Sequence, residues 1–242
     1  MITLQRIPST NDYLKEALSK STPLPEGTVI MAVDQHDGRG QKGTVWQSEP
    51  GKNLTISLLL TPTFLDPKQQ FALTAAISLA VARWLESLTH VSVKIKWPND
   101  IYIGDRKIGG ILIENILKGK SWKSAVIGIG ININQTIFPA GIQYQATSVK
   151  QILHKDCQVS ELLPDLCKHI EQEYIALKSG RFDTTLADYK QKLYRLNELH
   201  PYLVEGINVS GVLRGVTETG RLQIDFNGHL VDFDIKEIAF VI

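Results

Sequence analysis

The chain has 242 residues, 43% hydrophobic and 21% charged, which is enough for one large domain or a medium domain plus a small one. Its formal net charge of +1 excludes a global attraction to nucleic acid or to a membrane. Two cysteines exclude a disulfide framework, and the N-terminus lacks the features of a signal peptide. No apolar run approaches the length of a membrane span, so we expect a cytoplasmic protein.

The first predicted element is a helix that begins after Pro8 and ends near Lys20. Ser9, Thr10 and Asn11 stand at its start, where hydroxyl and amide side chains cap the free backbone N–H groups. Three such groups at a helix N-terminus are also a set of donors and acceptors for a polar ligand. Both roles stay open at this point of the chain.

A glycine-rich segment, residues 35–46, follows a predicted strand over residues 28–33. Glycines and cations alternate within six positions of it, and an aromatic residue follows: Gly38, Arg39, Gly40, Lys42, Gly43 and Trp46. Glycines let backbone N–H groups turn inward, and nearby positive charge then favours an anion such as phosphate. A phosphate cradle beside an aromatic platform suggests a nucleotide.

Three other interpretations of this segment are considered. Gly38-x-Gly40-x-x-Gly43 matches the dinucleotide-binding pattern, but Pro50-Gly51 and a β-rich run follow where that pattern requires a helix, so we reject it. A P-loop is excluded because no Gly-Lys-Ser/Thr follows at the required spacing. Taken alone, the segment could also be a solvated hairpin connection.

The next predicted elements are a strand over residues 54–60 and a largely buried helix over residues 67–88, which has no assigned chemistry. Residues 91–96 then alternate apolar and polar, the period of a strand with one buried face. Lys96 ends that strand before the turn Trp97-Pro-Asn-Asp100. A lysine at this place is well positioned to be held against a ligand.

A hairpin with its tip at residues 105–107 is predicted next. Gly109-Gly110 in its second strand suggests a bulge or the close approach of another group. In the following strand, residues 125–134, Gly128 and Gly130 remove side chains from the face that carries Asn132. This opens space for a ligand or, equally, admits a neighbouring helix.

Five of these motifs, taken together and in order, resemble the biotin protein ligases. They are Ser9-Thr-Asn11, Gln35-x-x-Gly-Arg-Gly-x-x-Gly-x-x-Trp46, Lys96-Trp-Pro-Asn-Asp100, Arg106-Lys-Ile-Gly-Gly-Ile-Leu-Ile-Glu114 and Gly128-Ile-Gly-Ile-Asn132. The resemblance is dense from about residue 5 to 134 and extends to the C-terminus by architecture only. It implies an α+β fold, with a mixed-sheet catalytic domain of the biotin/lipoate ligase superfamily (SH2-like) and a small C-terminal SH3-like β-barrel.

The resemblance also implies a two-step reaction. Biotin and ATP, with Mg²⁺, give biotinyl-5′-AMP and pyrophosphate, and the biotin then passes to a lysine of a biotin carboxyl carrier protein domain. By the same similarity Arg39 and Lys96 are the catalytic cations. The implied biotin-binding residues are Ser9, Thr10, Asn11, Gln35, Gly38, Arg39, Gly40, Lys96 and Gly110. The implied nucleotide-binding residues are Arg39, Gln41, Lys42, Trp46, Gly130 and Asn132, and no resident metal site is implied. Family members often carry an arginine at the position of Gln41, so this chain has an uncharged residue where the adenylate would be retained.

The last third of the chain carries less chemistry. Residues 160–179 and 184–194 predict amphipathic helices. A zinc site from His154, Cys157, Cys167 and His169 is disfavoured because their spacing matches no standard motif. From about Leu196 short strands with turn signals begin, and Asn227-Gly228 is a strong hairpin signal. We therefore divide the chain into a catalytic domain, residues 1–195, and an SH3-like domain, residues 196–242.

Two other functions are weighed against the ligase. A lipoate or octanoate ligase or transferase of the same superfamily usually carries an Arg-Arg-x-Ser-Gly-Gly-Gly type loop, which this chain lacks. A nucleic-acid binder is disfavoured by the near-zero net charge and by the absence of aromatic and basic interleaving in the barrel. No helix-turn-helix precedes Ser9, so we expect a short form that is not a repressor, and a homodimer is possible.

Overall fold

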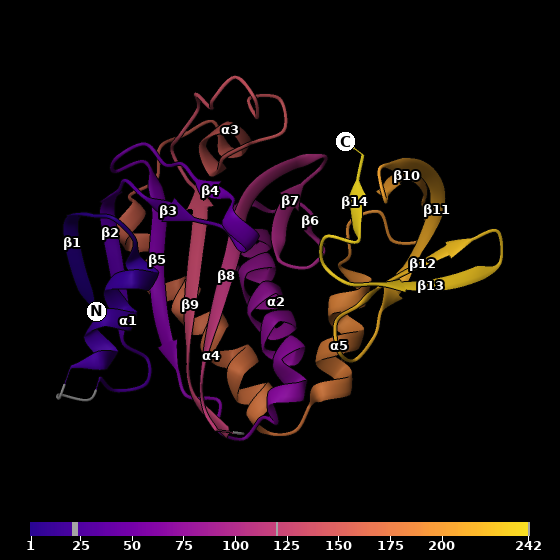
Figure 1. The fold of residues 1–242 in the computed structure, drawn as a ribbon. Coiled ribbons are helices and arrows are strands. Elements are labelled where there is room, and N and C mark those ends of the chain that lie inside the picture. The colour runs from indigo at the N-terminus through magenta and orange to yellow at the C-terminus, as the bar shows by residue number, and fades with distance from the viewer. Residues whose placement is uncertain (21–23, 120, 242) are drawn as a thin grey trace.

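A computed structural model describes residues 1–20, 24–119 and 121–241, without the side chains of Lys42 and Lys118. Two sheets dominate it, a seven-stranded mixed sheet and a five-stranded antiparallel sheet (Figure 1). The strands are β1 (Ile2–Ile7), β2 (Val29–Gln35), β3 (Gly38–Arg39), β4 (Val45–Trp46), β5 (Asn53–Leu60), β6 (Val93–Lys96), β7 (Asp100–Ile103), β8 (Arg106–Lys118), β9 (Ser121–Asn132), β10 (Leu199–Val204), β11 (Ile207–Val216), β12 (Leu222–Phe226), β13 (His229–Phe233) and β14 (Ile238–Phe240). The α-helices are α1 (Thr10–Ser19), α2 (Gln70–Thr89), α3 (Val149–Leu153), α4 (Leu163–Lys178) and α5 (Phe182–Gln191).

The large sheet has the order β1-β2-β5-β9-β8-β7-β6, and only its β1–β2 pair is parallel. Strand β1 is an addition to the predicted elements. The α+β fold with a mixed sheet and an antiparallel C-terminal sheet is confirmed. Two predicted strand boundaries are wrong. Strand β6 begins at Val93 rather than at residue 91, and β9 covers Ser121–Asn132 rather than residues 125–134. Strand ends depend on the pairing partner, which a local sequence pattern does not reveal.

Helices cover both faces of the large sheet, which explains why β5 is buried along its whole length. Leu14 of α1 packs against Ile30 and Leu59 on one face. Helix α2, with α4 beside it, covers the other face and meets the opposite side chains of the same strands, such as Met31 and Leu58 (Figure 1). The sheet therefore lies between helix α1 on one face and helices α2 and α4 on the other.

Helix α2 and the short 3₁₀ turn before it are long and apolar enough to cross a membrane by length and composition alone, so the expectation that no apolar run approaches that length is wrong. However, 67% of the apolar window is buried inside the protein. Trp84, Leu79 and Leu85 on this helix have essentially no exposed surface. Helix α2 is therefore a buried core helix. A helix that is apolar on all sides is expected in a protein core as well as in a membrane.

The five-stranded sheet follows the order β13-β12-β11-β10-β14. Its β12–β13 hairpin turns at Asn227 and Gly228, which have φ of 54° and 92°. Positive φ at both central residues is the geometry for which the Asn-Gly pair is suited, so the predicted hairpin is confirmed. Helix α5 ends at Gln191, earlier than predicted, because Leu193 turns back to bridge to Ile95 of β6.

Candidate functional site

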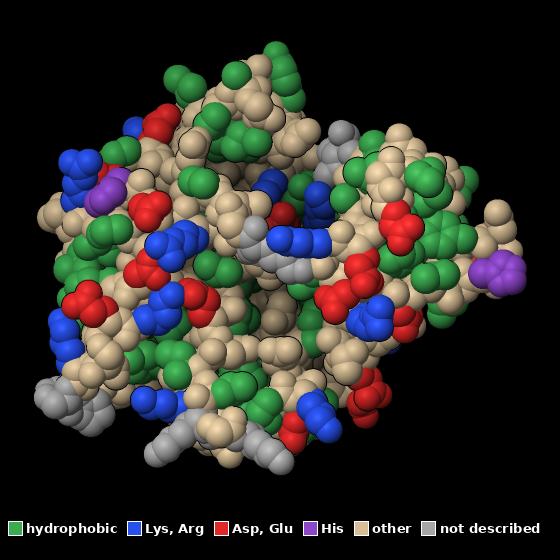
Figure 2. Space-filling model, in the orientation of Figure 1, with side chains coloured by type: hydrophobic (Ala, Val, Ile, Leu, Met, Phe, Trp, Pro, Cys, Tyr) green, Lys and Arg blue, Asp and Glu red, His purple; other side chains and the backbone are tan. Residues whose placement is uncertain are grey.

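A cavity of about 470 Å³ lies over the middle of the large sheet, on the face that carries α1. The space-filling view shows a hollow in the middle of one face of the molecule, with basic and acidic side chains in it (Figure 2). The predicted site residues that line the cavity are Ser9, Thr10, Asn11, Gln35, Arg39, Gly40, Gln41, Trp46, Gly110, Gly130 and Asn132. The structure thus brings together residues that are up to 123 positions apart in the sequence.

The floor of the cavity is formed where two adjacent strands, β8 and β9, carry glycines and therefore lack side chains. Gly130 of β9 lies directly opposite Thr55 of β5 on one side and Gly110 of β8 on the other. Gly128, two residues earlier, lies on the same face of β9. The predicted open space on this face is therefore present, and cross-strand glycines supply it.

At one end of the cavity, the start of α1 is tied to the end of β2. Ser9 caps the helix, and its Oγ accepts a hydrogen bond from the backbone N–H of Asp12 at 3.3 Å. Both the backbone N–H and the hydroxyl of Thr10 donate to Oε1 of Gln35, at 2.8 and 3.1 Å. These two bonds fix the orientation of the Gln35 amide, so its Nε2 is the donor left for a ligand.

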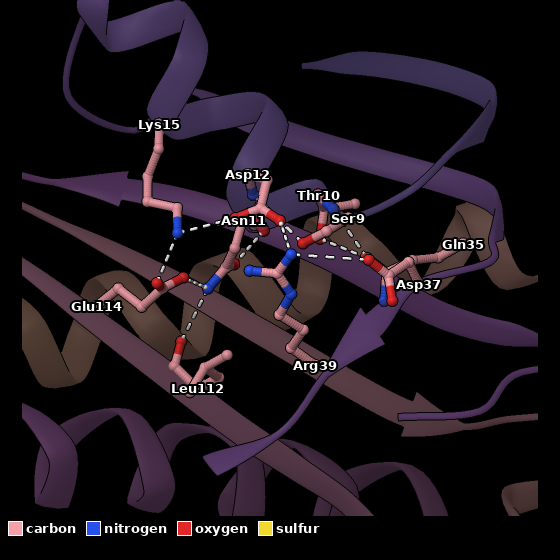
Figure 3. Close-up of polar contacts among 11 residues, drawn as sticks. Ser9, Thr10, Asn11, Asp12, Lys15, Gln35, Asp37, Arg39, Leu112 and Glu114 are labelled. Atoms are coloured by element: carbon pink, nitrogen blue, oxygen red, sulfur yellow. Dashed lines mark hydrogen bonds and ion pairs between the residues drawn. The ribbon is translucent and has the colours of Figure 1, made fainter. Parts of the chain in front are cut away.

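Asn11 lies in the cavity wall, but its amide is already occupied by the protein. Its Nδ2 donates to Oε2 of Glu114 at 2.8 Å and to the Leu112 carbonyl (Figure 3). Its Oδ1 accepts from the Ser57 hydroxyl at 2.5 Å. Both amide hydrogens are therefore used. Asn11 is better placed to hold α1 on the sheet than to bind a ligand through its amide.

The glycine-rich segment is a small hairpin, β3–β4, that stands outside the large sheet. Gly43 has a φ of +85° at its tip, a conformation that favours glycine. The backbone N–H of Gly40 donates to the Thr44 carbonyl at 2.8 Å and thus closes the hairpin. This corrects part of the predicted cradle, since the Gly40 N–H is not turned toward an anion here.

Arg39 extends from this hairpin toward the first turn of α1. Its Nη2 lies 3.1 Å from Oδ2 of Asp12 and 3.7 Å from Oδ2 of Asp37 (Figure 3). Gly38, also predicted in the site, is not in the cavity wall, because it packs against Nε2 of Gln35 and the backbone of Trp46. It permits the close approach of these two residues rather than contacting the cavity.

The opposite end of the cavity contains an aromatic ring and an amide. The Trp46 indole lies against Gly130, where an added Cβ would be 2.5–2.9 Å from three indole atoms. Its Nε1 is buried and has no hydrogen-bond partner in the described part of the chain. Asn132 donates from Nδ2 to the Thr147 carbonyl at 3.0 Å, which orients its carbonyl oxygen as an available acceptor.

The two lysines near the cavity are placed differently from what we expected. Lys107, which the sequence reasoning did not select, lines the cavity and forms an ion pair with Asp100, with 2.6 Å between Nζ and Oδ1. Lys96 is not among the lining residues. Its ammonium lies 5.4 Å from the ring centres of both Tyr102 and Phe240, and burial lowers its pKa despite the nearby Asp100 charge.

The physical reason lies in the register of the β7–β8 hairpin. Lys96 is opposite Asp100, which is opposite Gly110, so Lys96 belongs to the edge strand and is two strands from the glycine floor. The register shifts between Ile101 and Tyr102, which places Lys107 opposite Tyr102. The ammonium of Lys107 then reaches back over the bare backbone of Gly110. The predicted bulge is present, one residue before the glycines.

The Trp97-Pro-Asn turn supports the site from behind. Trp97 donates from its indole nitrogen to the Gly220 carbonyl of the small barrel at 2.8 Å, and the Tyr189 hydroxyl donates to the Pro98 carbonyl at 2.7 Å. The Asn99 side chain donates to the backbone of Ile111 in β8. The turn therefore connects β8, α5 and the barrel, and it places Asp100 at the cavity.

The remaining wall was not predicted. Phe138, Pro139 and Ile142, in the segment between β9 and α3, close the cavity from above. The backbone of Lys107 pairs with this segment through the Gln145 carbonyl and the Thr147 N–H. An irregular segment has no periodic pattern from which its position can be predicted. The one available signal was that its apolar residues follow the glycine-rich strand β9. Among the described residues, no group of three or more His, Cys, Asp or Glu could hold a metal ion.

Comparison with known proteins agrees with this geometry. The sequence model of the biotin/lipoate A/B protein ligase family matches residues 3–132. The chain is 41% identical over 130 residues to the bifunctional ligase/repressor BirA of Bacillus spizizenii, covering 52% of this chain and 39% of that protein. It is 30% identical over 237 residues to BirA of Escherichia coli, covering 92% of this chain and 68% of that protein.

A solved structure with a similar fold is the biotin protein ligase from Aquifex aeolicus in complex with biotin and ATP, with a TM-score of 0.82 and 30% identity over 98% of this chain and 97% of that one. The chain spans about two fifths of the first curated relative that it matches. The motifs that carry the resemblance lie within the matched residues and converge on one cavity. The chain belongs to the biotin/lipoate A/B protein ligase family.

Proposed function

We propose that this protein is a cytoplasmic biotin protein ligase. In the first step a biotin carboxylate oxygen attacks the α-phosphorus of ATP, the bond to the pyrophosphate breaks, and biotinyl-5′-AMP forms. In the second step the amine of a carrier-protein lysine attacks the acyl carbon, releasing AMP and a proton. The observation that carries the proposal is one cavity lined by polar side chains from the start of α1 and the end of β2, by the Trp46 ring and by two cations, Arg39 and Lys107.

The polar end suits the ureido ring of biotin. A urea presents both N–H donors and a carbonyl acceptor, so its pocket needs groups of both kinds. Gln35 supplies an Nε2 donor whose direction Thr10 fixes, and the hydroxyls of Ser9 and Thr10 have acceptor capacity. Asn11 belongs to the support of this end rather than to the direct contacts.

The centre and the far end suit the nucleotide. A carboxylate and a phosphate repel each other, so their reaction requires positive charge at the place where they meet. Lys107, over Gly110, and Arg39, from the hairpin, are the pocket-lining cations with described side chains. We propose Lys107 for the role that the sequence suggested for Lys96. Trp46 offers a face for adenine, and the carbonyl oxygen of Asn132 accepts from its amino group.

Magnesium fits this site as part of the substrate Mg·ATP. Asp100 is the single carboxylate among the cavity-lining residues that the structure describes, and Lys107 already pairs with it. Mg²⁺ prefers several oxygen ligands and is commonly held through substrate phosphates. The chain's own residues therefore bind and orient the nucleotide, while the triphosphate would carry the metal and its charge neutralisation.

The acceptor is proposed to be a biotin carboxyl carrier protein domain. The hairpin β3–β4 and the apolar segment around Phe138 both line the cavity and would shield the mixed anhydride from water. We also propose a division into a catalytic unit, residues 1–195, and an SH3-like unit, residues 196–242. It is supported by the separate C-terminal sheet.

The experiment is biotin-dependent release of pyrophosphate from ATP, with lipoate and octanoate as parallel substrates. Lys107→Met should lower kcat/KM by about a hundredfold or more, because it removes a charge from the point of bond formation. Lys96→Met is the matched variant and should have a much smaller effect. Equal turnover with lipoate, or no turnover with biotin, would refute the assignment, and the reverse order of the two variants would restore Lys96 to the site.

A further inference from the structure

Of the two described cations that line the cavity, Arg39 and Lys107, Arg39 is the one that the large sheet does not hold in place. It stands on a two-stranded hairpin outside the large sheet, and 57% of its side chain is exposed. A long exposed side chain has many rotamers, and holding it in one of them costs entropy. Something on the protein must therefore orient Arg39 if it is to meet a phosphate in one geometry.

Asp12 is a carboxylate that can do this, because it is itself anchored on both sides. Its backbone N–H donates to the cap residue Ser9, and its Oδ1 lies 2.9 Å from Nζ of Lys15. Lys15 is in turn 2.6 Å from Glu114 on β8. Although partial burial opposes the charge, the hydrogen bonds to Glu114 and Asp12 raise the pKa of Lys15, so this bridge stays charged at neutral pH.

The network continues into the polar end of the cavity. Glu114 accepts from the Asn11 amide nitrogen (Figure 3), and the Ser57 hydroxyl donates to the oxygen of the same amide. A chain of charged and amide groups thus runs from β5 and β8 through the first turn of α1 to Arg39. Asp37 also faces Arg39, but at 3.7 Å, with 63% of its side chain exposed. Within the described part of the chain no second cation holds the Asp37 carboxylate, and exposed pairs of this kind contribute little.

The geometry leaves part of the guanidinium available. Both carboxylates contact Nη2 of Arg39, and its Nε and Nη1 have no partner among the described residues. A guanidinium carries five N–H donors in a rigid planar fork, so fixing one nitrogen fixes the direction of the others. Asp12 can therefore hold Arg39 while the remaining donors bind an anion.

We propose that Asp12 is a positioning residue, which holds Nη2 of Arg39 so that the other guanidinium donors meet a nucleotide phosphate. The proposal rests on the proposed function and adds a residue that does not itself touch the substrate. Two features make it specific to this chain's site. First, Asp12 belongs to the helix turn that also supplies the polar end of the cavity. Second, the residue after Gly40 is the uncharged Gln41, so Arg39 carries more of the phosphate contact.

The test compares Asp12→Asn with the matched variant Asp37→Asn. Both remove one carboxylate near Arg39 at nearly constant volume. Asp12→Asn should lower kcat/KM for ATP in adenylate formation by about tenfold, because it releases a group that must be placed within about 1 Å. Asp37→Asn should change it less than twofold. Biotin affinity and Tm, measured for each variant, should stay close to those of the wild type.

A double-mutant cycle with Arg39→Lys shows whether Asp12 acts through Arg39. In the Arg39→Lys background, Asp12→Asn should add less than a twofold effect. Asp12→Glu, which retains the charge, should recover activity relative to Asp12→Asn. Calorimetric binding of ATP without biotin gives a second readout, which should weaken in Asp12→Asn only.

Three results would overturn the proposal while leaving the ligase function intact, because each needs an active wild type. Tighter ATP binding in Asp12→Asn would mean that the carboxylate competes with phosphate for Arg39. Equal effects of Asp12→Asn and Asp37→Asn would mean a general charge effect, and full additivity with Arg39→Lys would mean an independent role. Absence of biotin-dependent turnover in the wild type would instead refute the proposed function.

Discussion

Gly130→Ala should impair the binding of ATP at one end of the cavity without impairing the binding of biotin at the other. The new Cβ would lie 2.5 Å from Cε2, 2.7 Å from Cζ2 and 2.9 Å from Nε1 of the Trp46 indole. Ordinary contact begins at 3.4 Å, so the ring must retreat by roughly 1 Å. Gly130 lies in a central strand paired on both sides, whereas Trp46 is on a two-residue strand of the outer hairpin. The ring should therefore move, and the sheet should not.

The expected loss is confined to nucleotide binding. Overpacking costs about 1–3 kcal/mol where a core cannot adjust, and the position of Trp46 on a short hairpin outside the large sheet places Gly130→Ala at the lower end of that range. Stacking of a base on an aromatic side chain contributes about 1–3 kcal/mol. Its loss corresponds to roughly a 5- to 150-fold weaker affinity. We expect KM for ATP to rise within that range and the Kd for biotin to change by less than about twofold.

The assay is pyrophosphate release at saturating biotin with varied ATP, together with calorimetric titration of biotin into the free enzyme. Trp46→Leu is the control, since it removes the ring without filling the space, and it should raise KM for ATP similarly. An unchanged KM for ATP in Gly130→Ala would refute the placement of adenine on Trp46. A large loss of biotin affinity would show that the two ends are not separable.

Three further predictions concern the polar end, the core and a buried charge. Gly128→Ala should weaken biotin binding rather than ATP binding, as calorimetry would detect, because its Cβ would lie 2.6 Å from the fully bonded Asn11 amide. Leu14→Ala should lower the free energy of unfolding by about 2–5 kcal/mol in urea titrations, because Leu14 is the fully buried apolar side chain of α1. A loss below about 1 kcal/mol would contradict this. Burial lowers the pKa of Lys96 from its ordinary 10.5, so the folded state binds this proton less tightly than the unfolded chain. Stability contributed by Lys96 should therefore rise with pH up to about 10.5, and Lys96→Met should abolish that rise in urea titrations between pH 7 and 10.

Much of the site could be predicted because local chemistry determines it. The cap at Ser9, the Asn227-Gly228 hairpin and the buried helix α2 follow from backbone preferences and hydrophobic periodicity, which act within a few residues. The glycines of β9 could be predicted to open space because side chains alternate along any strand. Most of the predicted residues accordingly line one cavity.

Other features depend on contacts between distant segments. The sequence pointed to Lys96 as the second cation and not to Lys107, and the register shift in the β7–β8 hairpin decides that Lys107 reaches the cavity. Asn11 had the chemistry of a ligand, but Ser57 and Glu114, 46 and 103 positions away, use its amide. The Gly40 N–H is likewise taken by Thr44.

The sequence by itself determined which residue types stand at the ends of helices and strands, because capping, turn formation and side-chain alternation are local. It also determined the family, through the order of five motifs. Only the tertiary structure decided which donors and charges remain free for a ligand, because each buried polar group takes the nearest partner that the packed sheet and helices present. For that reason only the structure reveals the position of Lys107 beside Asp100 and the ion pair between Asp12 and Arg39.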